Sequence, residues 1–592
     1  MQRAVDLDSC AKEPIHVPGA IQPHGALLAF DDEGRLRMAS TNAAAMLGAL
    51  PPFGEQPGDG HLTREPRTLL AASVGRNAML DTGAVVLGER VHHVVLHRSD
   101  ELLVVEIEAR NTELPPLDGF TMAAQRAIGR LNYDGGLERL LDDAVREVRA
   151  LSGFDRVMAY RFLPDDSGLV ASEARRDDLE PFLGMRYPAS DIPSQARRLY
   201  TRAPLRLIAD VAYTSVPIEP TLNPLTQRPL DLSHSTLRSI SPIHVEYPTN
   251  MGVQASMSIS IVVGDKLWGL IACHHMSPRV VPHAVRMSCN LIAQVVSILV
   301  TRGSMAEDME LRERALGVQQ PLIQLLAGGD NAVHDLTARQ PNITDLLACD
   351  GAAVVLGGDV AHNGRVPSDE AIRGIADWVR SHAPGTTWST FEVGRELDDP
   401  ALVDQCGGIA GILAAPFFRE HNGIVLWFRR EEVETVRWGG NPDKEYGVGP
   451  LGPRLSPRGS FKEWRQIVEG RSRRWTPQEL AAAERFRIAL QDAAMSEARL
   501  RIGALEKANQ ELDRVTYVVS HDLRTPLRAI GSLNDFIEEA LHEGKLEDAL
   551  SHVTMMRARV LRLDALIVAI LAYARAGHSK QEARAISVRA RL

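Results

Sequence analysis

The stretch PASDIPSQARRLYTRAPLRL, Pro188–Leu207, lies at the centre of the most informative part of the chain. Apolar runs that are typical of β-strands surround it: DRVMAYRFL precedes it, and SMSISIVVG and KLWGLIACHHM follow it. Short runs of this kind, separated by turn-forming residues, predict an α+β unit with a sheet of about six strands that ends near residue 276.

Two further α+β units are predicted on either side of this one. Between about 15 and 115, apolar runs such as GALLAF and LLVVEIEA alternate with turn-rich pieces, and a helical stretch over 121–152 follows. Residues 282–315 contain one glycine and no proline after the first residue, which predicts one long helix between domains. The third unit, over about 320–485, is interrupted by an insertion rich in glycine, proline and arginine, Trp438–Trp475.

The C-terminal part is predicted to be helical, since no proline occurs past residue 478 until Pro526. Apolar residues at seven-residue steps indicate a coiled-coil seam and a parallel helical dimer. The seam consists of Ala498, Leu505, Leu512 and Val519. A second amphipathic helix is expected over about 549–575.

Length and composition indicate a modular globular protein. At about 100–200 residues per domain, 592 residues correspond to about four units. The net charge of −10 argues against a nucleic-acid surface, and no apolar run of about 18 residues predicts a membrane span. The N-terminus lacks a secretory pattern and the five cysteines contain no CxxC pair. We therefore expect free thiols, no metal site and a cytoplasmic location.

The string SHDLRTPL, Ser520–Leu527, places a histidine and an acid side by side on the predicted C-terminal helix. Asp522 can orient one ring nitrogen of His521 and leave the other as a nucleophile, as a phosphoacceptor requires. A lone His–Asp pair is usually only a solvated helix face, so the whole string carries the hypothesis. It resembles the H-box of sensor histidine kinases, with His521 phosphorylated and Thr525 in the position linked to phosphatase action.

The residues after His521 do not contain a Gly-rich phosphate-binding loop. Their glycines, Gly531, Gly544 and Gly577, are well separated. We therefore expect no ATP-binding domain in this chain, so that it is either truncated or dependent on ATP-binding partners in trans. Whether it acts as an enzyme stays open.

Two more strings extend the pattern of the central unit: STLRSISPIHVEYPTNMGVQASMSIS, Ser235–Ser260, and LIACHHM, Leu270–Met276. With the opening stretch they resemble the bilin-binding GAF domain of phytochromes, and the order of the whole chain resembles that family. The resemblance implies an α+β fold of three successive PAS/GAF-like antiparallel-sheet domains joined by long helices, then a C-terminal α-helical hairpin forming a dimeric four-helix bundle. The expected parts are an N-terminal arm (1–14), a PAS domain (15–120), a GAF domain (121–300), a PHY domain (301–490) with a tongue (436–476), dimerisation and phosphoacceptor helices (491–580) and a tail (581–592).

The resemblance also implies a bilin site. Arg206 and Arg238 match the arginines that bind the two propionates. Asp191 and His244 match the groups near the ring nitrogens, and His274 matches the donor to the ring D carbonyl. The hydroxyls expected near the propionates are those of Tyr200, Ser256 and Ser258, and the expected aromatic walls are Tyr160, Tyr187 and Tyr247. Each residue alone is more often an ordinary core or surface residue, and only the joint pattern favours a site.

The attachment point follows from the same resemblance. In plant and many cyanobacterial phytochromes a cysteine immediately precedes the position of His244, but this chain has Ile243, which cannot form a thioether. Cys10, in DSCAKEPIHVPGAIQPHG, matches the N-terminal cysteine that bacteriophytochromes attach to biliverdin. We therefore expect biliverdin IXα on Cys10. The family also threads this segment through a GAF loop as a knot.

The insertion resembles the tongue of the PHY domain through WGG, Trp438–Gly440, and PRGSF, Pro457–Phe461. The resemblance implies an ion pair between Arg458 and Asp191 that seals the pocket, and a tongue that refolds on photoconversion. Many members have a glutamate where this chain has Gln466, so contacts of the far-red state are expected to differ.

The expected function is a red/far-red photoreceptor that signals as a homodimer through a histidine-kinase-type helical module to a response regulator. Two alternatives stay open. The chain could be an active kinase that phosphorylates His521 from ATP, against which the glycine-poor end argues. It could also be a small-ligand sensor without photochemistry, against which the tongue and the paired arginines argue.

Overall fold

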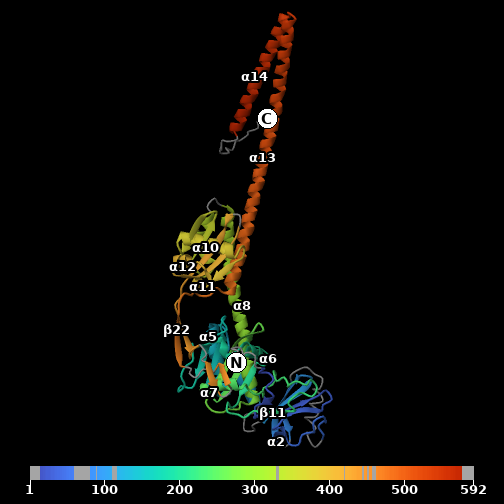
Figure 1. Ribbon diagram of the computed structural model, residues 1–592, viewed down its shortest axis with the longest axis vertical. Coiled ribbons are helices and arrows are strands. Elements are labelled where there is room, and N and C mark those ends of the chain that lie inside the picture. The colour runs from blue at the N-terminus through green and yellow to red at the C-terminus, as the bar shows by residue number, and fades with distance from the viewer. Residues whose placement is uncertain are drawn as a thin grey trace, which may run out of the picture.

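The computed structural model is elongated, with α+β units in its lower and middle parts and a helical hairpin that projects from them (Figure 1). It describes residues 14–58, 80–87, 90–109, 117–328, 332–418, 421–442, 446–449, 452–455 and 462–576. Cys10, Arg458 and the tail 581–592 lie outside the described residues. The mixed α+β class with antiparallel sheets is confirmed.

The first sheet has seven strands in the order β1-β11-β3-β2-β6-β5-β4. They are β1 (Ala20–Ile21), β2 (Gly25–Phe30), β3 (Leu36–Ser40), β4 (Leu80–Leu87), β5 (Arg90–Ser99), β6 (Leu102–Ala109) and β11 (Val216–Glu219). All of β2 is buried because both sheet faces are covered. Leu28 packs toward α2 (Ala43–Leu47), whereas Leu27 packs toward Ile218 and Leu237 from the second unit. Strand β11 therefore joins the two units within one sheet.

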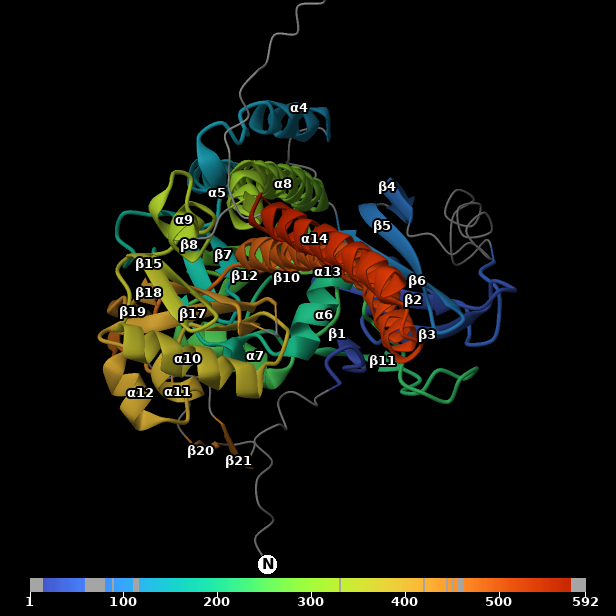
Figure 2. The ribbon, with the colours of Figure 1, turned by 90° about the horizontal axis from the view of Figure 1, so that it is seen from above.

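The second sheet has eight strands in the order β10-β12-β13-β7-β8-β9-β19-β22. Six come from the central unit: β7 (Arg156–Phe162), β8 (Gly168–Arg175), β9 (Arg186–Tyr187), β10 (Leu205–Ile208), β12 (Ala255–Val263) and β13 (Lys266–His275). Two come from the insertion: β19 (Glu434–Gly439) and β22 (Glu463–Val468). Figure 2 shows α5 (Gly136–Ser152) and α8 (His283–Gly328) on one side of this sheet, and α6 (Ser194–Arg202) and α7 (Pro242–Asn250) on the other. Helix α4 (Leu117–Ile128) precedes α5.

Helix α8 spans 46 residues and connects the second unit to the third. It continues past the predicted end at 315 and through Pro321, because Ala315 and Leu322 pack into the core of the third unit. Part of it, His283–Leu325, has the length and mean hydropathy of a membrane span by composition alone. Its apolar face already has a protein partner, since Ile292 and Val296 are fully buried in the core of the second unit.

The third sheet has five strands in the order β15-β14-β18-β17-β16, with a hydrophobic core on each face. The strands are β14 (Gly351–Leu356), β15 (Asp359–Gly364), β16 (Trp388–Thr390), β17 (Ile409–Pro416) and β18 (Ile424–Arg430). The helices are α9 (Ala332–Ala338), η2 (Ile343–Asp345), α10 (Asp369–His382), α11 (Val393–Glu396) and α12 (Pro400–Gln405). A ribbon of β20 (Tyr446–Gly449) and β21 (Gly452–Leu455) lies between β19 and β22 in the sequence.

The C-terminal helices form a hairpin. Helix α13 (Pro477–His542) has 66 residues and begins at a capping box in which Thr476 and Glu479 each accept a hydrogen bond from the other's backbone N–H. Helix α14 (Leu546–Ala576) returns alongside it after a turn at Gly544, whose φ is +77° (Figure 1). One chain thus supplies two helices, and the dimeric four-helix bundle stays a prediction.

Candidate functional site

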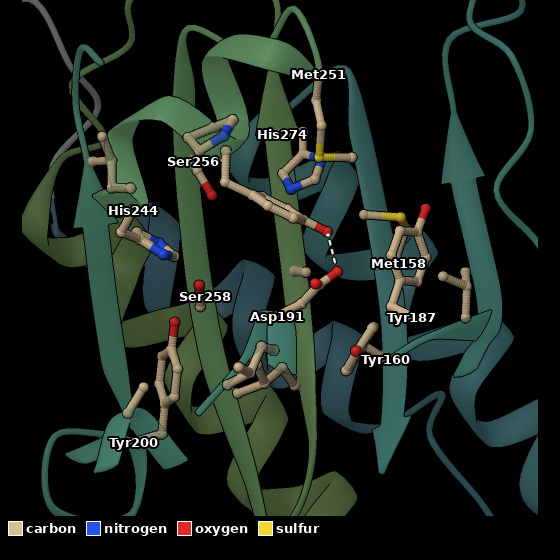
Figure 3. Close-up of a pocket in the computed structure, with 18 of the residues that line it drawn as sticks. Met158, Tyr160, Tyr187, Asp191, Tyr200, His244, Met251, Ser256, Ser258 and His274 are labelled. Atoms are coloured by element: carbon tan, nitrogen blue, oxygen red, sulfur yellow. Dashed lines mark hydrogen bonds between the residues drawn. The ribbon is translucent and has the colours of Figure 1, made fainter. Parts of the chain in front are cut away.

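A pocket lies on the face of the second sheet that α6 and α7 cover (Figure 3). It brings together nine of the predicted side chains. These are Tyr160, Tyr187, Asp191, Tyr200, His244, Tyr247, Ser256, Ser258 and His274. Much of the remaining lining is apolar and includes Met158, Ile208 and Met251. A mainly apolar pocket with several polar points suits an extended organic ligand.

Strand register builds the floor of the pocket. Residues that oppose each other on antiparallel strands project from the same face of a sheet. Ser256 on β12 opposes His274 on β13, and Ser258 opposes Ala272 in the same way. All four line the pocket, whereas Cys273 points the other way into the core against α5 and α8.

Aromatic and acidic residues form the walls. Asp191 lies in the short 3₁₀ helix η1 (Ala189–Asp191), and the Tyr247 hydroxyl from α7 donates to its Oδ2 atom at 3.1 Å (Figure 3). The rings of Tyr160 and Tyr187 have centroids 6.1 Å apart. The predicted partner of Asp191, Arg458, lies outside the described residues, so their ion pair stays a prediction.

Both pocket histidines are held uncharged at neutral pH. The pKa of His274 is lowered to about 3, first by burial and then by the Arg156 guanidinium. The pKa of His244 is lowered to about 4 by desolvation among the surrounding protein atoms and by the Arg206 and Arg238 charges, although its side chain is exposed where it lines the open pocket. Within the described part of the chain, Nδ1 of His274 has no hydrogen-bond partner. A neutral imidazole offers one donor and one acceptor to a ligand.

The two predicted propionate-binding arginines lie together. Nη2 of Arg206, on β10, donates to the backbone carbonyls of Arg238 and Ser239 at 3.1 and 3.2 Å. Arg238 is 3% exposed, and its Nε and Nη1 atoms have no partner among the described residues. Burial and the nearby Arg206 charge lower the pKa of Arg238 to about 8. A buried guanidinium is costly without an anion, so the carboxylate of a bilin propionate fits this place.

The second predicted site lies on α13. Nδ1 of His521 is 3.2 Å from Oδ1 of Asp522, and the two side chains are 70% and 53% exposed. The Thr525 hydroxyl donates to the His521 carbonyl at 3.3 Å, and the helix continues through Pro526. The structure therefore places an oriented and accessible imidazole on the helix surface, as a phosphoacceptor requires.

Sequence analysis missed two features of the pocket. One is the methionine lining, of which Met158 could have been found because strict alternation in DRVMAYRFL puts it on the same face as the predicted wall residue Tyr160. The other is a buried contact of Arg156 with Glu173 beside the pocket. Glu173 comes from another strand, and no signal in the sequence reveals how the two strands pair.

Three family models match the chain. A PAS fold matches residues 10–110, a GAF domain matches 136–300, and a phytochrome region matches 315–499.

Similar proteins extend over nearly the whole chain. A bacteriophytochrome of Pseudomonas aeruginosa is 40% identical over 574 residues, which cover 94% of this chain and 75% of that protein. Cyanobacterial phytochrome B of Nostoc is 37% identical, over 97% of this chain and 78% of that protein. A crystal structure of a bacteriophytochrome from the photosynthetic bacterium R. palustris has a TM-score of 0.70 at 36% identity, and the photosensory core of a Stigmatella aurantiaca phytochrome has 0.71 at 37%. Each covers 83% of this chain and is itself covered to 99%.

Proposed function

The chain belongs to the bacteriophytochromes, within the phytochrome family of photoreceptors, and from this we propose that it senses red and far-red light with biliverdin IXα as its bilin. The observation that carries the proposal is the buried Arg238 beside Arg206. The two arginines are not part of the pocket lining, but Arg206 opposes Ser258 of the pocket on the neighbouring strand, and both charges act on His244. Two cations that have no carboxylate partner among the described residues suit the two propionates of a linear tetrapyrrole. When bound, the bilin supplies the light-absorbing conjugated system and the double bond that isomerises.

The pocket residues have distinct tasks in this proposal. Arg206 and Arg238 hold the propionates, with the hydroxyls of Tyr200, Ser256 and Ser258 nearby. Asp191 and His244 face the ring nitrogens, and His274 donates to the carbonyl of the terminal ring. Tyr160, Tyr187 and Tyr247 form the walls around that ring. Because the pocket histidines are uncharged at neutral pH, each can donate to one ligand group and accept from another.

We further propose that the bilin is attached covalently to Cys10. The support is chemical, since a thiol can form a thioether whereas Ile243, at the alternative position, cannot. The described cysteines are poor candidates for attachment, because burial raises the pKa of Cys289 and Cys349 to about 12 and thus keeps the thiols protonated.

Signal output is proposed to pass through the helical hairpin. A homodimer would assemble along α13 and α14, in keeping with exposed apolar residues such as Leu505 and Leu512. Light would change the contact of Arg458 with Asp191 and, through the tongue, the presentation of His521 to a response regulator. The chain is proposed to act in the cytoplasm.

Co-expression with a haem oxygenase tests the proposal. The purified protein is expected to absorb red or far-red light and to change its spectrum reversibly under alternating red and far-red illumination. Cys10→Ser should abolish bilin that survives denaturation, whereas Cys349→Ser, at a half-buried thiol in the third unit, should retain it. Bilin that stays bound to denatured Cys10→Ser would refute the attachment, and a haem or colourless product would refute the photoreceptor.

A further inference from the structure

A buried ion pair lies beside the pocket. The Nε atom of Arg156, on β7, is 3.0 Å from Oε1 of Glu173, on β8, and the side chains are 4% and 3% exposed. The guanidinium lies over the Phe182 ring, 3.8 Å from its centroid, and donates to the Glu180 carbonyl. Glu173 also accepts hydrogen bonds from the backbone N–H groups of Phe182 and Leu183, at 2.9 and 3.1 Å. Both charged groups are therefore held in place from several sides.

The strand register puts Arg156 next to His274. The two residues oppose each other on β7 and β13, so their side chains share a face, with Cβ atoms about 5 Å apart. On its other side His274 opposes Ser256, which carries no charge. His274 lines the pocket whereas Arg156 does not. The guanidinium thus belongs to a residue next to His274 but is not part of the pocket lining.

We propose that Arg156, anchored by Glu173, is a positioning residue that adds to burial in opposing protonation of the His274 imidazole. A cation this close opposes protonation of the ring, and burial acts in the same direction. The uncharged ring can both donate and accept, whereas an imidazolium can only donate. The use of both the donor and the acceptor of His274 by the bilin rests on the proposed function. The effect of Arg156 on protonation of His274 is independent of that function.

Other titratable groups from the surrounding elements line the same pocket as the imidazole. They are Tyr160 from β7, Tyr187 from β9, Asp191 from η1, and His244 and Tyr247 from α7. Asp191 is the one acid in this set, and its Oδ2 atom accepts the Tyr247 hydroxyl. Arg156 is the charge that acts on the His274 pKa, after burial.

The test is a titration of His274 in the bilin-free protein, by NMR of labelled histidine, over the acidic range in which circular dichroism shows a folded chain. Arg156→Met with Glu173→Gln removes both charges and leaves no unpaired ion. We expect the pKa of His274 to rise by about one unit at most, because Arg156 opposes the imidazole directly whereas Glu173 lies one strand farther away, so that the loss of the positive charge outweighs the loss of the negative one. Arg156→Lys keeps the charge and should titrate like the wild type. Arg161→Gln is the matched control, since Arg161 lies on the same strand but its guanidinium lies over the Trp268 ring.

Identical His274 titrations in the wild type and the double variant would overturn the proposal. If the double variant does not fold, Arg156→Gln, which removes the positive charge and keeps a polar side chain beside Glu173, provides the same measurement. In the bilin-loaded protein, the loss of the light-induced absorbance change on acidification should move to higher pH in the double variant. If no variant binds a bilin, the proposed function fails, while the bilin-free titration still decides the role of Arg156.

Discussion

The buried Arg238 side chain is unfavourable for the stability of the bilin-free protein but favourable for binding of the bilin. Its side chain is 3% exposed, two of its nitrogens have no partner among the described residues, and Arg206 repels it. Replacement of such a buried charge by an apolar side chain of similar size is often stabilising. Arg238→Met should therefore stabilise the bilin-free protein by about 1–2 kcal/mol and weaken bilin binding.

Urea unfolding of the bilin-free chain and a titration with bilin measure the two effects separately. The matched control is Arg202→Met at the exposed end of α6, which should change the unfolding free energy by less than about 0.5 kcal/mol. Lower stability of Arg238→Met, or unchanged bilin affinity, would contradict the proposed role.

At the residue scale, the sequence predicts which residues belong to the site better than it predicts which of them contact each other. Asp191 and Tyr200 come from one contiguous string, and the period of two in SMSIS places Ser256 and Ser258 on one face. The contact of Arg156 with Glu173 depends instead on how β7 pairs with β8, where a bulge after Ala159 shifts the register. The residue pattern does not encode that shift.

At the scale of elements, Arg429 connects the third sheet to the output helix. This residue of β18 donates from Nη1 to the carbonyls of Arg473 and Arg474 at 3.2 and 3.0 Å, just where the chain returns from the tongue. Its guanidinium lies over the Trp475 ring, 3.7 Å from the centroid. It also donates to Glu479, which caps the start of α13. A movement of the tongue would therefore be passed to α13 through these contacts of Arg429.

Arg429→Met should destabilise the third unit by about 3 kcal/mol, because it leaves the buried Glu479 carboxylate without its Arg429 partner. Denaturant unfolding monitored by tryptophan fluorescence measures the loss. The double variant Arg429→Met with Glu479→Leu should regain part of the lost stability. Arg430→Met is the control, since its pair with Asp350 is 55% exposed on the arginine side and worth at most about 1 kcal/mol. Equal losses for the two arginines would rule out a special role of Arg429.

The lengths of helices and strands could be predicted only in part, because they too depend on tertiary contacts. Proline usually ends a helix, so the stretch 282–315 predicts a helix that ends before Pro321. The observed helix continues through Pro321 because Leu322 is buried in the third core, and tertiary packing outweighs the lost backbone hydrogen bond. In the same way, the insertion could be recognised as a tongue from its motifs, but the pairing of its strand β19 with β9 of the second sheet, at Trp438 and Arg186, could not be predicted.

At the scale of the whole molecule, a buried polar contact joins α8 to the first unit. Arg286 of α8 is fully buried and pairs with Glu108 at the end of β6. Beside it, the rings of His93 and His283 stack with centroids 3.6 Å apart. Since the same helix also packs into the cores of the second and third units, α8 contacts all three units.

Arg286→Met should loosen the first unit from this helix. It leaves the Glu108 carboxylate buried without its cation, which costs about 3–5 kcal/mol. Hydrogen exchange should then speed up in β2 and β6 while β17 of the third unit is unaffected. Glu108→Leu in addition should restore most of the protection, because no unpaired charge remains. Unchanged exchange in the single variant would show that β11 alone holds the unit in place.

The pH dependence of this contact has a defined sign. Burial raises the pKa of Glu108, but Arg286 and then His24 more than offset it, so the folded pKa lies below the ordinary value. A carboxyl whose folded pKa is depressed stabilises the fold above its unfolded pKa and loses that contribution as pH falls through the folded pKa. The difference in unfolding free energy between the wild type and Arg286→Met should therefore be full at neutral pH and shrink on acidification below about pH 4.5. A difference that grew on acidification would assign the coupling to the neighbouring histidines instead of to the ion pair.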